Sequence, residues 1–330
     1  MKKLAVFALS TMIAVFALTG CGKQASASAG LKSPGSTFVV GFDADFKPYG
    51  YIENGEYVGF DLDLAREVCR RNQWIFMAKP IAWEAKDMEL NSGSIDCIWN
   101  GFTIDGRESL YEWSIPYVDN SQVVLVLKNS NIKNFADLAG KTVAAQTDTP
   151  VLKALSPKGD RAALGKTFKK IVITPNYNNA VMELEAGSVD AVALDIGVAK
   201  DKLAAGKFRM LDEIVISEKY GIGFKLGNKA LRDAVQKTLI EMVEDGTAAK
   251  ISAKYFDGKD VLIVRRSVAE NVKADVKAAA EEVKADVKAA AKDVEADVKA
   301  AAKEVKAGVK AGAEEVKAGI KAELKAFDAK

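Results

Sequence analysis

Short apolar segments that alternate with helical patterns constrain the fold of this chain more than any other feature. Residues 37–42 are typical of a buried strand, and residues 60–69 carry apolar side chains at helical spacing. Further apolar strands follow, again separated by helical patterns, at 95–99, 123–127, 142–145, 171–174 and 191–194. Strands that alternate with helices predict an α/β fold, built on parallel sheets with helices on both faces.

Polar residues stand directly after four of these predicted strands. They are Asp43, Gly101 with Thr103, the segment 146–149, and Asp195. In open α/β sheets, ligands bind outside the carboxyl ends of the strands, where the connecting loops converge. We therefore expect the four loops to form a single binding site.

The N-terminus has the layout of a targeting segment. Lys2 and Lys3 precede an apolar stretch at 4–18, and a Leu-Thr-Gly-Cys sequence ends at Cys21. We predict that residues 1–20 are a signal peptide and that Cys21 is lipidated, because this sequence resembles a bacterial lipobox. The alternative is an ordinary signal peptide followed by an incidental cysteine. A lipid anchor would hold the mature protein at the outer face of the cytoplasmic membrane, since its acyl chains insert into the bilayer.

Two segments differ in composition from the strand and helix pattern. Residues 21–36 are rich in Ser, Ala, Gly and Lys without apolar periodicity, so they predict a flexible tether. Residues 265–330 contain Ala, Lys, Val, Glu and Asp in units of eleven residues, such as VKADVKAAAEE from Val272. Eleven residues span about three helical turns, so we expect one long C-terminal helix with a thin apolar stripe. Three interpretations of this helix are open: a solvated spacer, a right-handed coiled coil, and a membrane-surface helix.

Composition excludes several classes of function. The 47 basic and 45 acidic residues nearly balance, so no excess of positive charge favours nucleic acid as a partner. Histidine is absent, which excludes Ser-His-Asp hydrolysis and histidine-based zinc sites, and we expect no metal and no cofactor. Cys69 and Cys97 fall in a helical and a strand pattern, as small core residues do, while their spacing leaves a disulfide between them open.

Two longer segments carry specific motifs. The first, GFDADFKPYGYIENGEYVG at 41–59, contains a strand, a polar loop and a predicted turn at 54–55. The second contains SIDCIWNGFT at 94–103, followed by GRE at 106–108 and WSIPY at 113–117. Both segments resemble the polar amino-acid binding proteins that serve ATP-driven importers, which are solute-binding family 3.

This resemblance covers residues 38–264 and implies a two-lobed type II periplasmic-binding-protein fold. In this fold the chain crosses twice between the lobes, and the two crossings form a hinge. Residues 37–122 and 222–264 would form lobe 1, residues 123–221 would form lobe 2, and residues 265–330 would add the C-terminal helix. A ligand that contacts both lobes only when they are shut would favour the closed state.

The charges of a free amino acid define what its site must contain. A buried carboxylate and ammonium need a fixed cation, hydrogen-bond donors and a counter-carboxylate. Arg107 suits the ligand carboxylate, because its planar guanidinium can donate two parallel hydrogen bonds. The resemblance implies that Asp195 binds the ammonium with help from Gly101 and Thr103. Asp195 could also cap the helix that is predicted to begin after it.

The resemblance assigns four further contacts, and the sequence departs from the family pattern at two points. It implies that the ligand side chain meets Asp43, Phe46 and Trp83 and that the ligand carboxylate meets Thr149. The family usually has a glycine and a second hydroxyl where this chain has Asp148 and Pro150. The segment between Gly101 and Arg107 is also slightly shorter than in many family members. These differences make Thr149 a weaker candidate than Arg107.

The sequence predicts a binding protein rather than an enzyme. We expect it to capture a free amino acid and to present it to the permease subunits of an ABC transporter. The alternative is a dehydratase on the same scaffold, with a carboxylate such as Asp43 or Glu84 as its acid. A third interpretation is a sensory or structural module in which the eleven-residue repeats are the working part. The identity of the amino acid stays open, because the sequence does not show the shape of the pocket.

Overall fold

The computed structural model of the chain describes residues 30–328. This part forms two units, an α/β unit that ends at Arg265 and a helical unit from Arg266 onward. The predicted signal peptide, the predicted lipidation site at Cys21 and most of the predicted tether lie outside the described residues.

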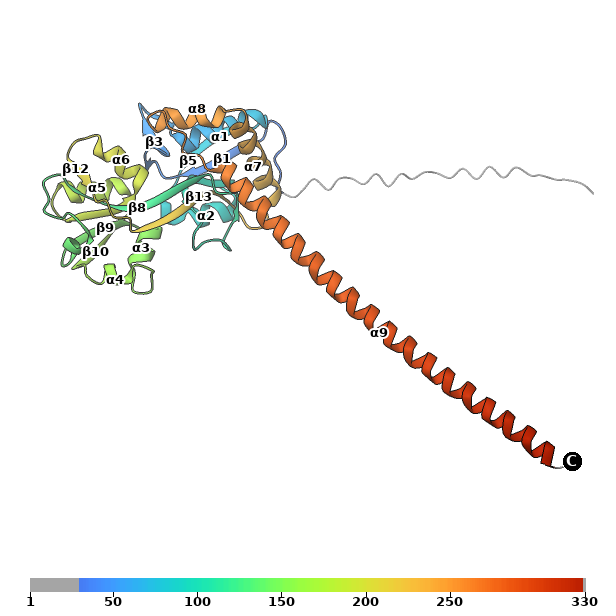
Figure 1. Ribbon diagram of the computed structural model, residues 1–330. Helices are drawn as coiled ribbons and strands as arrows, with labels where there is room; N and C mark the ends of the chain where they lie inside the picture. The colour runs from blue at the N-terminus through green and yellow to red at the C-terminus, as the bar shows by residue number, and fades with distance from the viewer. Residues whose placement is uncertain (1–29, 329–330) are drawn as a thin grey trace, which may run out of the picture. The chain divides into compact units, whose positions relative to one another are not determined.

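The α/β unit is built on a ten-stranded mixed sheet (Figure 1). Its strands lie in the order β10-β9-β11-β8-β13-β6-β1-β5, while β12 pairs with β8 and β7 pairs with β13. The bounds are β1 Thr37–Phe42, β5 Ile75–Pro80, β6 Cys97–Thr103, β7 Glu112–Trp113, β8 Val118–Leu127, β9 Thr142–Gln146, β10 Lys170–Thr174, β11 Ala191–Asp195, β12 Phe208–Met210 and β13 Ile216–Phe224. A separate three-stranded sheet contains β2 Asp45–Phe46, β3 Gly50–Glu53 and β4 Glu56–Val58.

Two long central strands divide the main sheet into two lobes. β8 and β13 pair antiparallel with each other, and they also pair antiparallel with β11 and β6 on either side. The strands β6, β1 and β5 of lobe 1 run parallel, as do β10, β9 and β11 of lobe 2. The prediction of parallel sheets is therefore right for each flank and wrong for the centre. β8 and β13 carry the chain between the lobes in opposite directions, so they must run antiparallel.

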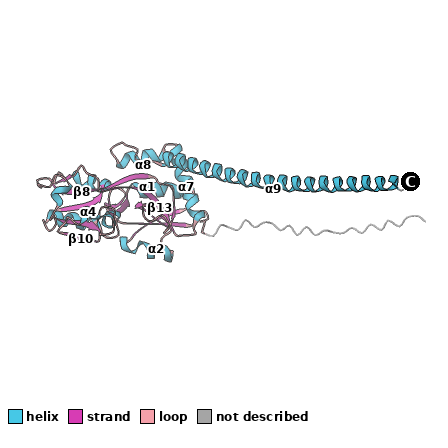
Figure 2. Cartoon of the chain, turned by 60° about the horizontal axis from the view of Figure 1, so that its bottom comes forward, coloured by secondary structure: helices cyan, strands magenta, loops and turns pink. Residues whose placement is uncertain are grey.

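Helices lie on both sides of the strands in each lobe (Figures 1 and 2). Lobe 1 contains α1 Phe60–Arg71, the 3-10 turn η1 Trp83–Ala85, α2 Lys86–Ser92, α7 Lys229–Glu244 and α8 Thr247–Tyr255. Lobe 2 contains η2 Phe135–Leu138, α3 Pro150–Leu155, α4 Ala162–Gly165, α5 Tyr177–Glu185 and α6 Ile196–Leu203. This arrangement leaves the carboxyl ends of the strands of both lobes facing a common gap, where loops can form a site.

Each lobe has an apolar core of its own. In lobe 1, Ile95, Ile98 and Phe102 are buried together with aromatic side chains. In lobe 2, the core includes Val143 of β9 and Ala193 of β11. Separate cores allow the lobes to move as bodies about β8 and β13, since neither core needs the other. The lobe boundaries at residues 122 and 221 stay a prediction.

Local sequence accounts for several element ends, but two predicted strands have wrong bounds. β8 begins at Val118, five residues before the strand predicted at 123–127, and β6 differs as well. Asn54 and Gly55 have φ angles of 53° and 84°, as a tight hairpin turn requires, and they join β3 to β4 as predicted. The strand predicted at 95–99 is wrong by several residues, because β6 is Cys97–Thr103. It extends further because its carboxyl end pairs with β13. Gly101 and Thr103 therefore belong to the strand instead of the loop after it.

The two cysteines of the α/β unit are free. Cys69 in α1 and Cys97 in β6 are buried, and no disulfide joins them. Burial raises the pKa of the Cys69 thiol to about 12, which makes it a poor nucleophile at neutral pH. Both residues serve as small core side chains, so the question of a disulfide that their spacing left open is settled against the bond.

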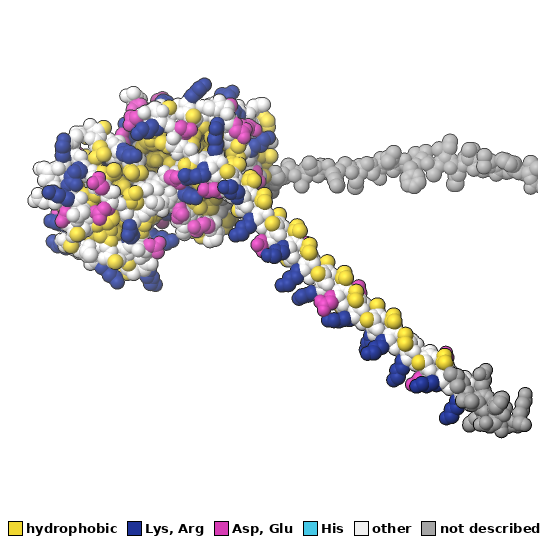
Figure 3. All heavy atoms as spheres, viewed as in Figure 1, with side chains coloured by type: hydrophobic (Ala, Val, Ile, Leu, Met, Phe, Trp, Pro, Cys, Tyr) yellow, Lys and Arg dark blue, Asp and Glu magenta, His cyan; other side chains and the backbone are white. Residues whose placement is uncertain are grey.

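The helical unit consists of α9, which is Val264–Asp328 and 65 residues long. This continuous helix is the one that the eleven-residue repeats predict. Figure 3 shows a line of apolar side chains along it, with Lys side chains along one edge of that line. Across residues 30–328, none of the helices combines the length and the apolar character that crossing a bilayer requires.

Candidate functional site

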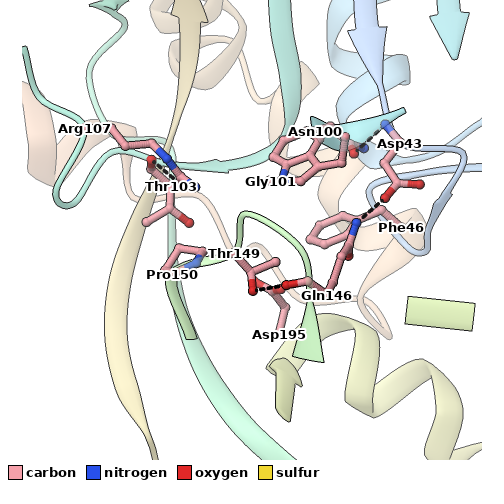
Figure 4. Close-up of a pocket in the computed structure, with 11 residues that line it drawn as sticks. Asp43, Phe46, Asn100, Gly101, Thr103, Arg107, Gln146, Thr149, Pro150 and Asp195 are labelled. Carbon is pink, nitrogen blue, oxygen red and sulfur yellow. Dashed lines mark hydrogen bonds between the residues drawn. The ribbon is translucent and has the colours of Figure 1, made fainter. Parts of the chain in front are cut away.

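The eight predicted site residues line one cavity between the lobes (Figure 4). Lobe 1 contributes Asp43, Phe46, Trp83, Gly101, Thr103 and Arg107, and lobe 2 contributes Thr149 and Asp195. Asn100, Gln146 and Pro150 complete the lining. The space enclosed by these residues is about 300 Å³, its open mouth included.

Gly101 sits where only a glycine fits. Its φ angle is 56°, and a Cβ at this position would lie 2.6 Å from the ring of Phe46. Its N–H donates to Asp61 Oδ2 at 2.7 Å, and the Tyr117 hydroxyl donates to the same oxygen at 2.9 Å. Asp61 is fully buried, and this burial raises its pKa to about 7. A buried carboxyl group therefore holds the β6 backbone against the cavity.

The Asp43 side of the cavity is held by hydrogen bonds across the two lobes. The backbone N–H of Asp43 donates to Asn100 Oδ1 at 2.9 Å, and Gln146 Nε2 of lobe 2 donates to Asp43 Oδ2 at 2.8 Å. Burial raises the pKa of Asp43, although hydrogen bonds from the Asp45 backbone N–H and from Gln146 oppose the rise. A second cavity begins at Asp43 and is also lined by Asp45, Trp83 and Glu84, so this side of the site is acidic.

Two aromatic side chains form the walls. The ring of Phe46 lies 5.8 Å from the ring of Tyr177, at an interplanar angle of 29°. Trp83 meets Phe102 edge to face, with ring centroids 5.4 Å apart. Packing against other rings fixes both side chains, so the walls of the cavity are rigid.

The Asp195 end is a buried network of hydrogen bonds. Oδ1 of Asp195 accepts from Asn120 Nδ2 at 2.6 Å, from Gln122 Nε2 at 2.7 Å and from the Tyr220 hydroxyl. Among the described residues, Oδ2 accepts one hydrogen bond, from the Tyr177 hydroxyl at 2.6 Å, so it has a lone pair left for a ligand. Asp195 does stand at the N-cap position of α6, but its side chain makes no capping bond. The capping alternative is therefore wrong for the side chain.

Glu218 of β13 lies beside Asp195 in the same network. Burial and the Asp195 charge raise the pKa of Glu218. Its Oε2 and the side-chain amide oxygens of Asn120 and Gln122 are buried without a hydrogen-bond partner among the described residues. Burial also raises the pKa of Asp195, which its hydroxyl and amide donors oppose, so the two carboxyl groups titrate as a pair. A proton shared by this pair would supply the donor that the group lacks.

The opposite end of the cavity is built from ion pairs. Nη2 of Arg107 donates to the Asp148 backbone carbonyl at 2.8 Å, and it lies 3.7 Å from Asp148 Oδ1. Nη1 donates to the Thr103 carbonyl at 3.3 Å, and the guanidinium lies 5.2 Å from the Phe102 ring centroid. Arg107 of lobe 1 therefore reaches across to a loop of lobe 2, and only 12% of its side chain is exposed.

The backbone conformation at Asp148 accounts for the glycine that the family usually has at this position. Its φ angle is 51°, a left-handed conformation that glycine adopts freely and aspartate adopts at a cost. Its carboxylate pairs with Lys86, whose side chain is 1% exposed and whose Nζ lies 5.3 Å from the Trp83 ring centroid. Asp148 is 47% exposed, so the buried partner of this pair is the lysine of lobe 1.

Thr149 lines the cavity, but its hydroxyl has a partner inside the protein. Its Oγ1 donates to the Gln146 carbonyl at 2.7 Å. The hydroxyl proton would have to turn away from that carbonyl before it could bind a ligand carboxylate. Arg107 is the stronger candidate for that contact, as the sequence departure at Asp148 and Pro150 predicts.

The sequence analysis missed part of the site. Gln146 is the last residue of β9 and belongs to the segment 146–149 that the sequence places at the site, whereas Asn100 lies inside β6 and was not singled out. Lys86 looks like an ordinary surface lysine in sequence, and Tyr177 and Tyr220 look like core aromatics. Nothing local to these three positions shows that they support the site.

The chain matches one described family over most of the α/β unit. The family is the bacterial extracellular solute-binding proteins, family 3, and the match covers residues 38–258. The probable histidine-binding protein of Neisseria gonorrhoeae is 30% identical over 268 residues, which are 78% of this chain and 96% of that protein. An arginine-binding extracellular protein of Bacillus subtilis is 28% identical over 272 residues, 78% of this chain and 100% of that protein.

Two of the solved structures with the same fold are bacterial binding proteins with amino acid ligands. An ABC uptake transporter substrate-binding protein of Streptococcus pneumoniae, with bound histidine, has a TM-score of 0.65 and 28% identity over 69% of this chain and 94% of that chain. An arginine-, lysine-, histidine-binding protein of Geobacillus stearothermophilus has a TM-score of 0.62 and 31% identity over 70% and 99%. The predicted two-lobed type II periplasmic-binding-protein fold is confirmed, and these relatives give no support to a dehydratase.

Proposed function

The chain belongs to the bacterial extracellular solute-binding proteins of family 3, and from this premise we propose that it binds a free amino acid between its lobes. It then delivers the amino acid to the permease of an ABC transporter. One observation carries the proposal: the same cavity is lined by the guanidinium of Arg107 and by the buried carboxylate of Asp195. Opposite charges in one cavity match a zwitterion, whose two groups must lose water together.

Each lining residue has a role in this proposal. Arg107 binds the ligand carboxylate, with Thr149 as a weaker second contact after its hydroxyl has turned. Asp195 binds the ammonium through Oδ2, together with the Gly101 carbonyl and the Thr103 hydroxyl. The ligand side chain lies between the rings of Phe46 and Trp83 and points toward Asp43.

We propose further that the ligand side chain is cationic. Asp43 stands between the main cavity and the second cavity lined by Asp45 and Glu84, so a positive group there would meet three carboxylates. The names of the relatives, which include histidine- and arginine-binding proteins, support this choice. A comparison of the affinities for cationic and neutral amino acids of the same shape separates the effect of side-chain charge from the effect of side-chain size.

A thermal-shift screen with the free amino acids tests binding, and calorimetry then measures affinity. We expect arginine, lysine or histidine to raise the melting temperature, because saturating ligand stabilises the folded state. Arginine and its neutral analogue citrulline form the matched pair, and we expect citrulline to bind at least ten times more weakly. Equal affinity for the two would exclude a cation site at Asp43. No shift with any amino acid would exclude the function itself.

Lipid anchoring at Cys21 is proposed from the N-terminal sequence alone, since this residue lies outside the described part. Metabolic labelling with palmitate in a bacterial host tests it, with Cys21→Ala as the control. We expect label in the parent chain and none in the variant. Label in both chains, or in neither, would exclude an anchor at Cys21.

We also propose that α9 takes part in a coiled coil. Its valines are exposed along the helix although they recur at regular spacing, and an apolar stripe of this kind is stabilised when a second helix covers it. Sedimentation of the full chain over a range of concentrations tests whether it self-associates.

A further inference from the structure

The apolar stripe of α9 runs unbroken through the repeats. Two valines in each repeat are between 55% and 68% exposed, and they are Val272, Val276, Val283, Val287, Val294, Val298, Val305, Val309 and, in the last described repeat, Val316. Eleven residues complete about three turns, so equivalent positions of successive repeats return to the same side of the helix. Figure 3 shows the resulting line of apolar side chains.

Opposite charges flank this stripe. At about 98° per residue, the valines at repeat positions 1 and 5 and the alanines at positions 8 and 9 fall within an arc of about 100°. Position 2 lies about 80° to one side of its centre and position 4 about 80° to the other. Position 2 is Lys273, Lys284, Lys306 and Lys317 in four repeats, and position 4 is Asp275, Asp286 and Asp297 in three. Farther out, the same two flanks carry Lys277 and Glu282 in the first repeat.

This charge pattern discriminates between helix orientations. When two helices pack stripe to stripe in parallel, the left flank of one meets the right flank of the other. When they pack antiparallel, equal flanks meet. A second copy of α9 would therefore place lysines against aspartates in the parallel arrangement, and lysines against lysines in the antiparallel one. Flanking charges of this kind set partner choice and orientation in coiled coils.

One residue departs from the pattern. Glu295 occupies position 2 of the third repeat, where the other repeats have lysine. Lys299 pairs with it inside the same helix at 2.7 Å, so the lysine flank gains no net negative charge at this point.

We propose that α9 associates in parallel with α9 of a second copy of this chain. The inference rests on the coiled-coil proposal and adds the partner and the orientation. The apolar stripe supplies the contact, and the lysine flank of each copy pairs with the acidic flank of the other. The eleven-residue period gives the pair a slight right-handed supercoil.

Charge variants test the contact. In the full chain with Cys21→Ser, we replace Asp275, Asp286 and Asp297 by lysine, which places lysine on both sides of the stripe at the flank positions nearest to it. Sedimentation equilibrium should show at least about tenfold weaker association. The control replaces Ala274, Ala285 and Ala296 by lysine, which adds three positive charges on the opposite side of the helix, half of the change in the first variant, and should weaken association less than threefold. Equal effects of both variants would overturn the flank pairing.

Spin labels test the orientation. A label on Ala274→Cys, in the same Cys21→Ser chain with Cys69 and Cys97 buried, reports the distance between copies by double electron–electron resonance. A parallel pair places the labels within about 40 Å, even with a stagger of one repeat, which is about 16 Å. An antiparallel overlap of the repeats places them more than about 60 Å apart. That longer distance in an associated sample overturns the parallel arrangement and leaves the coiled coil standing, whereas a monomer at every concentration overturns both.

Discussion

The two ends of the cavity are built on different physical principles. At one end, Asp195 is buried and receives hydrogen bonds from neutral side chains, two of which lie on β8 and one on β13. At the other end, Arg107 and Lys86 of lobe 1 meet the Asp148 loop of lobe 2 through charged contacts. The Asp195 end is therefore organised before ligand arrives, while the Arg107 end depends on contact between the lobes.

Asp195→Asn breaks the organised end and should have the largest effect. The ammonium of the ligand would lose its only counter-charge in a buried setting, which costs about 3 to 5 kcal/mol and weakens binding by roughly two to four orders of magnitude. Titration calorimetry with the amino acid found in the screen measures this loss. Asp212→Asn, at an exposed position of lobe 2, is the control and should bind normally. Unchanged affinity of the Asp195→Asn protein would show that Asp195 does not bind the ligand ammonium.

Arg107→Ala removes the guanidinium that we propose binds the ligand carboxylate. We expect a loss of about 2 to 4 kcal/mol, somewhat smaller than at Asp195, because Lys86 remains nearby and can draw the ligand carboxylate. The measurement is again calorimetry, and Arg70→Ala serves as the control, since Arg70 is 70% exposed and pairs only with Glu67 of its own helix. If the Arg107→Ala protein binds the ligand with unchanged affinity, then Arg107 does not bind the ligand carboxylate.

Lys86→Met sharpens the comparison, because it tests a residue that does not line the cavity. Without Lys86, Arg107 is the remaining cation near the Asp148 carboxylate among the described residues, so Asp148 competes with the ligand for that guanidinium. We expect about tenfold weaker binding. Adding Asp148→Gly should restore affinity to within about threefold of the parent, since glycine suits the left-handed backbone and removes the competing charge. A double variant no better than Lys86→Met would show that the lysine only supports the fold.

The pH dependence of stability reports on the organised side of the site. Asp61 has a pKa of about 7 in the folded chain, far above that of an exposed aspartate, and the pKa of Glu218 is raised as well. The folded state therefore binds more protons than the unfolded state between about pH 4 and 7, so stability falls as pH rises through this window. The slope is at most about 1.4 kcal/mol per pH unit for each group. Urea unfolding should show a flatter profile for Glu218→Gln, and an identical profile would mean that Glu218 is ionised.

Much of this organisation was predictable from sequence, and the reason differs between the two ends. The strand ends that carry Asp43 and Asp195 are visible in the apolar pattern, because a buried strand and the loop after it differ sharply in composition. The Lys86 and Asp148 pair was not predictable, since the two residues come from different lobes and their contact depends on tertiary structure. The antiparallel centre was missed for a related reason, because strand direction at β8 and β13 follows from the path of the chain between lobes. A departure from the family pattern at Asp148 was the one sequence signal that pointed to this region.

Removal of the repeats tests whether both ends of the cavity are complete within the α/β unit. Every residue that lines the cavity precedes Arg265, and the valines of the repeats are exposed. We therefore expect a chain that ends at Glu270 to bind the amino acid with an affinity within about twofold of the full chain, as measured by calorimetry. Its melting temperature without ligand shows whether the shortened chain is still folded. Loss of affinity in a folded protein would mean that the C-terminal helix also contributes to ligand binding.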